Sequence, residues 1–134
     1  MKDEYKQTLI TYRLDRSKES LQAAELLLEN NMLTSAMNRI YYSMFYSVQA
    51  LLLQNEASFS KHSHVKGYFN REYIKKGIFP KQFGRLYNKI FEYRQKFDYV
   101  DLVIPEKEMI SEYIESAKEF NNKIEEYLQQ NINK

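Results

Sequence analysis

The chain lacks cysteine and tryptophan altogether, and its 134 residues include only 3 glycines and 2 prolines. Without cysteine it has no disulfide framework, no thiolate zinc site and no thiol nucleophile. So few glycines and prolines disfavour a β-sandwich or barrel, which needs a turn about every ten residues. No run approaches the roughly 18 apolar residues that span a bilayer, and the N-terminus lacks the apolar core of a signal peptide. We therefore expect a soluble, cytoplasmic, all-helical protein.

Positive charge is concentrated in one part of the chain. Residues 61–100 contain 10 Lys or Arg against 3 Asp or Glu, whereas residues 101–134 contain 4 against 8. A basic segment of this kind can attract phosphate. It can equally be a solvated helix face that the acidic final segment neutralises after folding, so both interpretations stay open.

Apolar residues recur at helical spacing in five amphipathic segments. In chain order these segments cover about 4–29, 34–54, 60–77, 80 to beyond 97, and 105 to the C-terminal tail. The connections are short, so we expect one domain, residues 1–134, folded as an antiparallel up-and-down helical bundle of four to five helices.

The expected helix ends rest on a few residues with strong positional preferences. Thr34 and Ser60 are predicted N-caps, Gly77 fits the position just after a helix, and Pro80 and Pro105 fit first turns.

The second and fourth segments should lie at the centre of the bundle, with Met44, Val48, Phe83 and Ile90 buried. The second is apolar nearly all round, and the chain contains 12 Tyr and 8 Phe. That is more aromatic surface than five helices readily cover, so we expect a homodimer.

Arg94 interrupts the buried face of the fourth segment, where the spacing from Phe83 and Ile90 calls for an apolar side chain. Its stem can pack along the stripe while its head reaches Asp98, Asp101 or water. Alternatively, the guanidinium sits at the edge of the bundle to grip a phosphate.

Polar residues also interrupt the second segment, at Asn38 and Arg39. Asn38, Tyr42 and Gln49 share a stripe and predict a polar seam. This seam either fixes helix register through hydrogen bonds or forms part of a ligand site.

Two histidines, His62 and His64, open the short basic third segment. A spacing of two on a helix points their rings in different directions, which is poor geometry for a shared metal. A histidine can still act there as a general base or phosphate ligand. The chain has no Gly-rich phosphate loop and no motif for zinc or calcium, so we expect no metal and no cofactor.

Three stretches together resemble the HEPN domain family, in its small stand-alone bacterial and archaeal branch. They are AMNRIYYSMFYSVQALLL, KHSHVKGYF followed by KKGIFP, and FEYRQKFDYVD. The resemblance covers essentially the whole chain. It implies a helical bundle that usually dimerises. Many family members are metal-independent RNA endonucleases of toxin-antitoxin and defence systems, and others are inactive helpers of nucleotidyltransferases.

In the nuclease type, an Arg followed after four to six residues by a His supplies the catalytic pair. Arg94 matches that Arg, but Tyr99 and Asp101 stand where the spacing places the His. His62 matches a His that recurs in the stand-alone branch, and Asn38 resembles a polar residue that the family places near its Arg.

The resemblance therefore implies a toxin-like protein, a candidate endoribonuclease in which Arg94 stabilises the phosphate and His62 or Tyr99 transfers protons. Asn38, Arg39 and Tyr42 are the expected substrate-binding residues. A second hypothesis is a non-catalytic module that holds a nucleotide or RNA for a partner nucleotidyltransferase antitoxin. A third is a purely structural dimer in which Arg94 is only ion-paired.

Overall fold

The computed structural model describes residues 2–100 and 103–132, and these residues form α-helices, one π-helical turn and short connections. The helices are α1 (Asp3–Glu29), α2 (Leu33–Gln54), α3 (His62–Phe69), α4 (Lys81–Tyr99) and α5 (Lys107–Ile132), with the π-helical turn η1 (Asn70–Ile74) continuing α3. No strand occurs within the described ranges. The predicted all-α bundle is thereby confirmed. In the same ranges, no helix is both long and apolar enough to cross a membrane.

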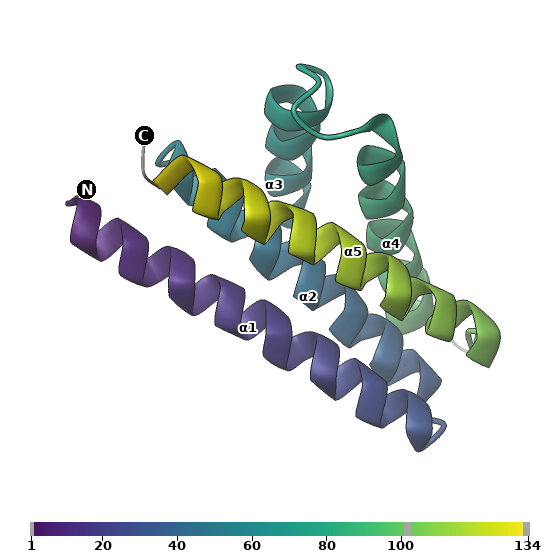
Figure 1. Ribbon diagram of the computed structural model, residues 1–134. Coiled ribbons are helices and arrows are strands. Elements are labelled where there is room, and N and C mark those ends of the chain that lie inside the picture. Colours follow the sequence, from purple (N-terminus) through teal and green to yellow (C-terminus); the bar gives the residue numbers. More distant parts are fainter. Residues whose placement is uncertain (1, 101–102, 133–134) are drawn as a thin grey trace.

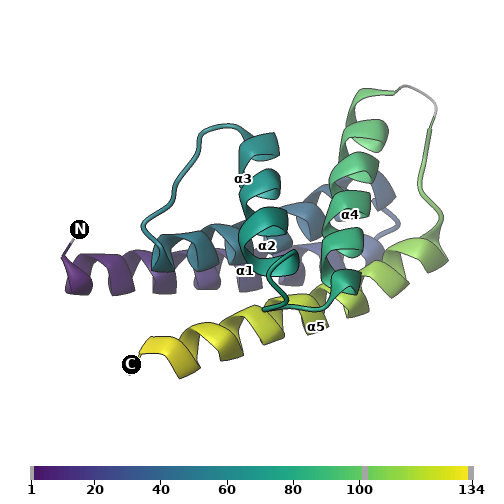
Figure 2. The same ribbon diagram turned by 90° about the horizontal axis from the view of Figure 1, so that it is seen from above.

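The five helices form two sets with different directions. Figures 1 and 2 show α1, α2 and α5 side by side as long helices, with α3 and α4 standing across them. Helix α2 runs opposite to α1, and α5 runs in the same direction as α2, because α3 and α4 bring the chain back. Helix α2 contacts each of the other four α-helices, so it is the centre of the bundle.

The hydrophobic core surrounds α2, as the sequence predicts. Helix α4, expected beside α2 at the centre, instead lies across the long helices and buries one face. Met44, Val48 and Ile90 have no exposed surface, and Phe83 is buried nearly as completely. Each large apolar side chain buried in this way contributes roughly 1.5–3 kcal/mol to folding. From α5, the buried positions are Ile110, Ile114, Ala117, Phe120, Ile124 and Leu128.

A group of small polar side chains crosses this core where α1, α2 and α5 meet. The hydroxyl of Ser17 donates to the carbonyl oxygen of Ser43 at 2.7 Å and lies 2.8 Å from the Ser47 hydroxyl. Nδ2 of Asn121 on α5 donates to the Ser43 hydroxyl at 3.2 Å. Because such buried bonds must all be made together, they fix how the three long helices face one another.

Neither expected N-cap is correct. Helix α2 begins at Leu33, directly after a tight turn in which Asn31 has a φ of 58° and Met32 N–H bonds to the Leu27 carbonyl at 2.9 Å. Thr34 is therefore already inside the helix. Helix α3 begins at His62, two residues after Ser60, and its N-cap position also lacks a side-chain hydrogen bond.

The glycine and proline positions agree better with the sequence. Gly77 has a φ of +79°, a left-handed conformation that favours glycine, and its N–H bonds to the Ile74 carbonyl at 3.0 Å. Pro80 occupies the N-cap position of α4, one residue before the expected first turn. Pro105 lies two residues before the first residue of α5.

Candidate functional site

Arg94 lies in the C-terminal part of α4, with its guanidinium against α2. Its Nη2 donates to the Tyr42 hydroxyl at 3.2 Å, and its Nε lies 3.2 Å from Oδ2 of Asp98. Its Cζ is 5.2 Å from the ring centroid of Tyr41 and 5.4 Å from that of Tyr42. Only 14% of the side chain is exposed, and two tyrosine rings and one carboxylate surround the guanidinium.

Asp98 connects this arginine to the start of α2. Nδ2 of Asn38 donates to Oδ2 of Asp98 at 2.9 Å. Oδ1 of Asn38 in turn accepts hydrogen bonds from Nε and Nη2 of Arg39, at 3.2 and 2.8 Å. The polar residues that interrupt α2 and α4 thus form one network.

His62, the first residue of α3, lies against the same part of α2. Its ring stacks on Phe45 with a centroid distance of 4.1 Å, and its Nδ1 lies 2.9 Å from the Tyr41 hydroxyl. Burial lowers the pKa of the His62 imidazole, and the positive charge of Arg94 lowers it further. His64 is exposed and faces Phe59 instead.

The structure therefore brings the six predicted site residues together. We call the group the Arg94 cluster; it comprises Asn38, Arg39, Tyr41, Tyr42, His62, Arg94 and Asp98, with Tyr99 at its edge. Tyr99 is 72% exposed, and its ring centroid lies 5.8 Å from Cζ of Arg94. Asp101 lies outside the described residues. The catalytic and binding roles of these residues stay predictions.

Two features of the site differ from the expected polar seam. Gln49 does not join the cluster, because its Oε1 accepts a hydrogen bond from Nη1 of Arg13 on α1 at 2.9 Å. Tyr41 and Phe45, which are not among the predicted site residues, contact the His62 ring. A histidine that contacts a buried tyrosine and a buried phenylalanine of another helix has no signature in sequence spacing, so the sequence does not predict this part of the site.

The charges of the cluster do not cancel. It contains two arginines, Arg39 and Arg94, against the single carboxylate of Asp98. Within the described parts of the chain, Arg39 forms no ion pair. The cluster therefore keeps a net positive charge that a phosphate can neutralise. No group of three potential metal ligands occurs among the described residues.

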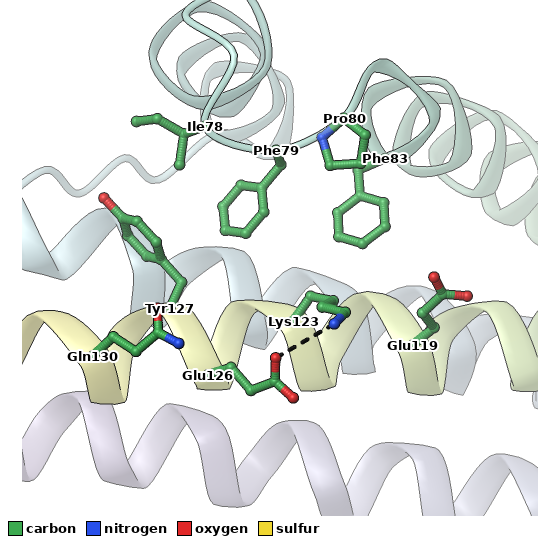
Figure 3. Close-up of a pocket in the computed structure, with 9 residues that line it drawn as sticks. All are labelled: Ile78, Phe79, Pro80, Phe83, Glu119, Lys123, Glu126, Tyr127 and Gln130. Carbon is green, nitrogen blue, oxygen red and sulfur yellow. Dashed lines mark ion pairs between the residues drawn. The ribbon is translucent and has the colours of Figure 1, made fainter.

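A hollow of about 320 Å³ lies elsewhere, between the segment before α4 and the C-terminal half of α5 (Figure 3). The rings of Phe79, Phe83 and Tyr127 line it, and an ion pair between Lys123 and Glu126 at 3.5 Å lies on the α5 side. None of its lining residues belongs to the Arg94 cluster. The lining of the hollow contains no histidine and no arginine. The Arg94 cluster is therefore the candidate site for phosphate chemistry.

The chain matches a known class of helical proteins. The model of the HEPN domain matches residues 10–127 of the chain. The chain belongs to the HEPN family.

Relatives in that family include proteins of bacteria and archaea. A Thermotoga maritima protein named "UPF0332 protein" is 46% identical over 124 residues, which cover 92% of this chain and 94% of the relative. The Methanocaldococcus jannaschii "Putative toxin MJ0142" is 36% identical over 115 residues, covering 86% and 78%. "Putative toxin MJ0605" of the same organism is 31% identical over 113 residues, covering 78% and 84%.

Proposed function

We propose that this protein is the toxin-like half of a toxin-antitoxin or defence pair, and that it cleaves RNA at the Arg94 cluster without a metal ion. One observation supports this most: the Arg94 guanidinium of α4 and the His62 imidazole of α3 meet at the same tyrosine of α2. Cζ of Arg94 lies 5.4 Å from the Tyr42 ring centroid, and the His62 ring centroid lies 5.9 Å from it. The names of the two archaeal relatives agree with a toxin.

The chemistry needs a base for the 2′-hydroxyl and a cation for the phosphate. Because its pKa is lowered, His62 is neutral near pH 7 and accepts the 2′-hydroxyl proton at Nε2, since Nδ1 faces Tyr41. The 2′-oxygen then attacks phosphorus, and the 5′-oxygen leaves. Arg94 stabilises the negative charge on the phosphoryl oxygens. A proton from the Tyr99 phenol or from water neutralises the departing oxygen.

In this proposal, the three expected substrate-binding residues orient Arg94 and add positive charge and an aromatic ring to the site. Asn38 holds Asp98 and thereby orients the guanidinium of Arg94. Arg39 supplies the positive charge that no described carboxylate neutralises. Tyr42 supplies its hydroxyl and a ring beside both arginines.

The decisive experiment is expression of the chain alone while cell growth and total RNA integrity are followed. The purified protein is then incubated with single-stranded RNA in the presence of EDTA. Wild type should arrest growth and cleave RNA despite the chelator, and His62→Ala and Arg94→Lys should each lose at least 100-fold in rate. His64→Ala is the matched control and should keep wild-type activity. If wild type leaves RNA intact at every enzyme concentration, the nuclease proposal fails.

A second candidate is a non-catalytic module that binds RNA or a nucleotide for a partner nucleotidyltransferase. It is favoured by Tyr99 standing where the family's nuclease type has its His, since a phenol is a poor base near neutral pH. In that case His62→Ala barely changes binding, whereas Arg94→Ala weakens it. A nucleotidyltransferase reading frame beside this gene, and its co-purification with this chain, would support the pair.

A further inference from the structure

A row of tyrosine and arginine side chains leads from the Arg94 cluster across α2 to α1. The Tyr42 ring, which contacts Arg94, lies 6.0 Å from the Tyr46 ring between centroids. Cζ of Arg16 on α1 lies 5.3 Å from the Tyr46 ring centroid, and Nη2 of Arg16 donates to the Tyr46 hydroxyl at 3.4 Å. Tyr12 lies one helical turn before Arg16.

We call this feature the tyrosine-arginine row. Its members, in spatial order, are Tyr12, Arg16, Tyr46, Tyr42, Arg94 and Tyr99.

The row is accessible from solvent, most of all at its ends. Tyr12 is 54% exposed and Tyr99 is 72% exposed. Tyr42 and Tyr46 in the middle are partly exposed, with their rings beside arginine side chains. An extended ligand could therefore contact the row along its whole length.

Positive charge dominates along the row. Two further arginines, Arg13 and Arg39, lie beside the row. Arg13 donates a hydrogen bond to Gln49 of α2, and Cζ of Arg39 lies 4.8 Å from the Tyr42 ring centroid. Two carboxylates pair with its arginines, Asp98 with Arg94 and Glu19 with Arg16. The latter pair is exposed at 3.6 Å, a kind that contributes little to stability and that a phosphate can replace.

We propose that the tyrosine-arginine row binds single-stranded RNA and leads it from α1 over α2 to the Arg94 cluster. This inference rests on the proposed function, because it names the form of RNA and its path. Guanidinium groups bind phosphates through paired N–H donors and stack on bases, and exposed tyrosine rings stack on unpaired bases. Duplex RNA fits poorly, because its bases already stack on one another.

The charge pattern also distinguishes RNA from a second copy of this chain. If the row itself formed a twofold interface, the same patch would face itself and two arginine-rich rows would repel each other. A polyanion with stacking bases complements both the charge and the rings.

The test is fluorescence anisotropy of a short labelled single-stranded RNA with the full chain. The RNA has 2′-O-methyl groups, so that cleavage through the 2′-hydroxyl cannot occur. The double variant Tyr12→Ala/Arg16→Ala should weaken binding about tenfold and reduce the dependence of affinity on salt. The matched control Tyr5→Ala/Arg85→Ala removes an exposed tyrosine and an exposed arginine outside the row and should change affinity by less than about twofold. Duplex RNA of equal length should bind several-fold more weakly than the single strand.

The outcomes separate this inference from the proposed function. If both double variants weaken binding equally, only net charge matters and the row is refuted. If only Arg94→Ala weakens binding, the proposed site stands and the row is refuted. If wild type binds no RNA, both fail. If Tyr12→Ala/Arg16→Ala instead changes the sedimenting mass, the occupant of the row is a second copy of the chain and the inference is wrong.

Discussion

The hydroxyl of Tyr41 lies 2.9 Å from Nδ1 of His62, joining a buried phenol to a partly exposed imidazole. Burial raises the pKa of Tyr41, so the phenol keeps its proton throughout the neutral range. Because Nδ1 faces this hydroxyl, Nε2 is the ring nitrogen left for a substrate. Burial of the His62 ring also lowers its pKa and so disfavours its charged form.

The first prediction is that His62 titrates below the ordinary histidine value of about 6.5. Burial and the nearby Arg94 both disfavour the imidazolium. NMR titration of the imidazole protons measures this directly, and the His64→Gln variant leaves His62 as the only histidine signal. Arg94→Ala should move the His62 pKa upward but keep it below 6.5, because burial is the larger cause. A wild-type value at or above 6.5 would contradict the environment described for the ring.

The lowered pKa of His62 also predicts how the stability of the folded protein changes with pH. Between the lowered pKa of folded His62 and about 6.5, the unfolded chain binds the proton and the folded chain does not. The free energy of unfolding should therefore decrease as pH falls through this window. Urea unfolding at pH 7.5 and 5.5 should show a smaller decrease for His62→Gln than for wild type. An equal decrease in the two proteins would assign the effect to other groups.

Sequence periodicity predicted the helices and the core because both depend on local spacing. Met44, Val48 and Ile90 recur on faces that α-helical geometry alone brings together, and all three are buried. The crossing of α3 and α4 over the long helices depends on contacts between distant residues instead. One such contact is the Tyr73 hydroxyl of η1, which continues α3, donating to the Leu51 carbonyl oxygen of α2 at 3.2 Å. No single segment contains that information.

In the candidate site, too, local spacing predicts some contacts, whereas others depend on residues far apart in the sequence. Arg94 was recognisable because it interrupts an apolar stripe, and the pair with Asp98, four residues later, follows from helical spacing. The bond from Asn38 to Asp98 joins residues 60 positions apart on α2 and α4, and the contact of Tyr41 with His62 joins α2 to α3. Such pairings appear only after the bundle has formed.

The second prediction concerns two glycines with opposite surroundings. A Cβ on Gly84 would lie 2.9 Å from Oδ1 of Asn70 and 3.1 Å from Cγ2 of Ile74, and Asn70 is held by its bond to Asn88. Gly84→Ala should therefore lower the free energy of unfolding by about 1–3 kcal/mol. Gly67→Ala, in α3 with nothing within 4 Å, should raise it by about 0.5–1 kcal/mol. Urea denaturation compares them, and equal effects would refute the close contact of α4 with η1.

The third prediction is a homodimer. Val100 is 49% exposed and Ile104 is 72% exposed, both in the connection between α4 and α5. Such apolar side chains favour contact with a second copy. Sedimentation equilibrium at micromolar concentration should give twice the 16.2 kDa of one chain. The Val100→Asp/Ile104→Asp variant should be monomeric with unchanged helicity, and a monomeric wild type would refute the prediction.

The fourth prediction tests what Asp98 does for Arg94. Under the proposed function, its carboxylate holds the guanidinium and also competes with the phosphate for it. Asp98→Asn removes one negative charge while keeping an oxygen for Asn38, so RNA should bind several-fold more tightly. The free energy of unfolding should fall by about 1–3 kcal/mol, because the side chains of the Arg94–Asp98 pair are mostly buried. Anisotropy and urea denaturation measure the two effects. Glu72→Gln is the matched control, since it removes a carboxylate paired with Lys76 in the same basic segment but outside the cluster, and it should change RNA affinity by less than about twofold. If the folded Asp98→Asn variant binds RNA more weakly than wild type, Asp98 does not compete with the phosphate but is needed to hold Arg94 in its binding position.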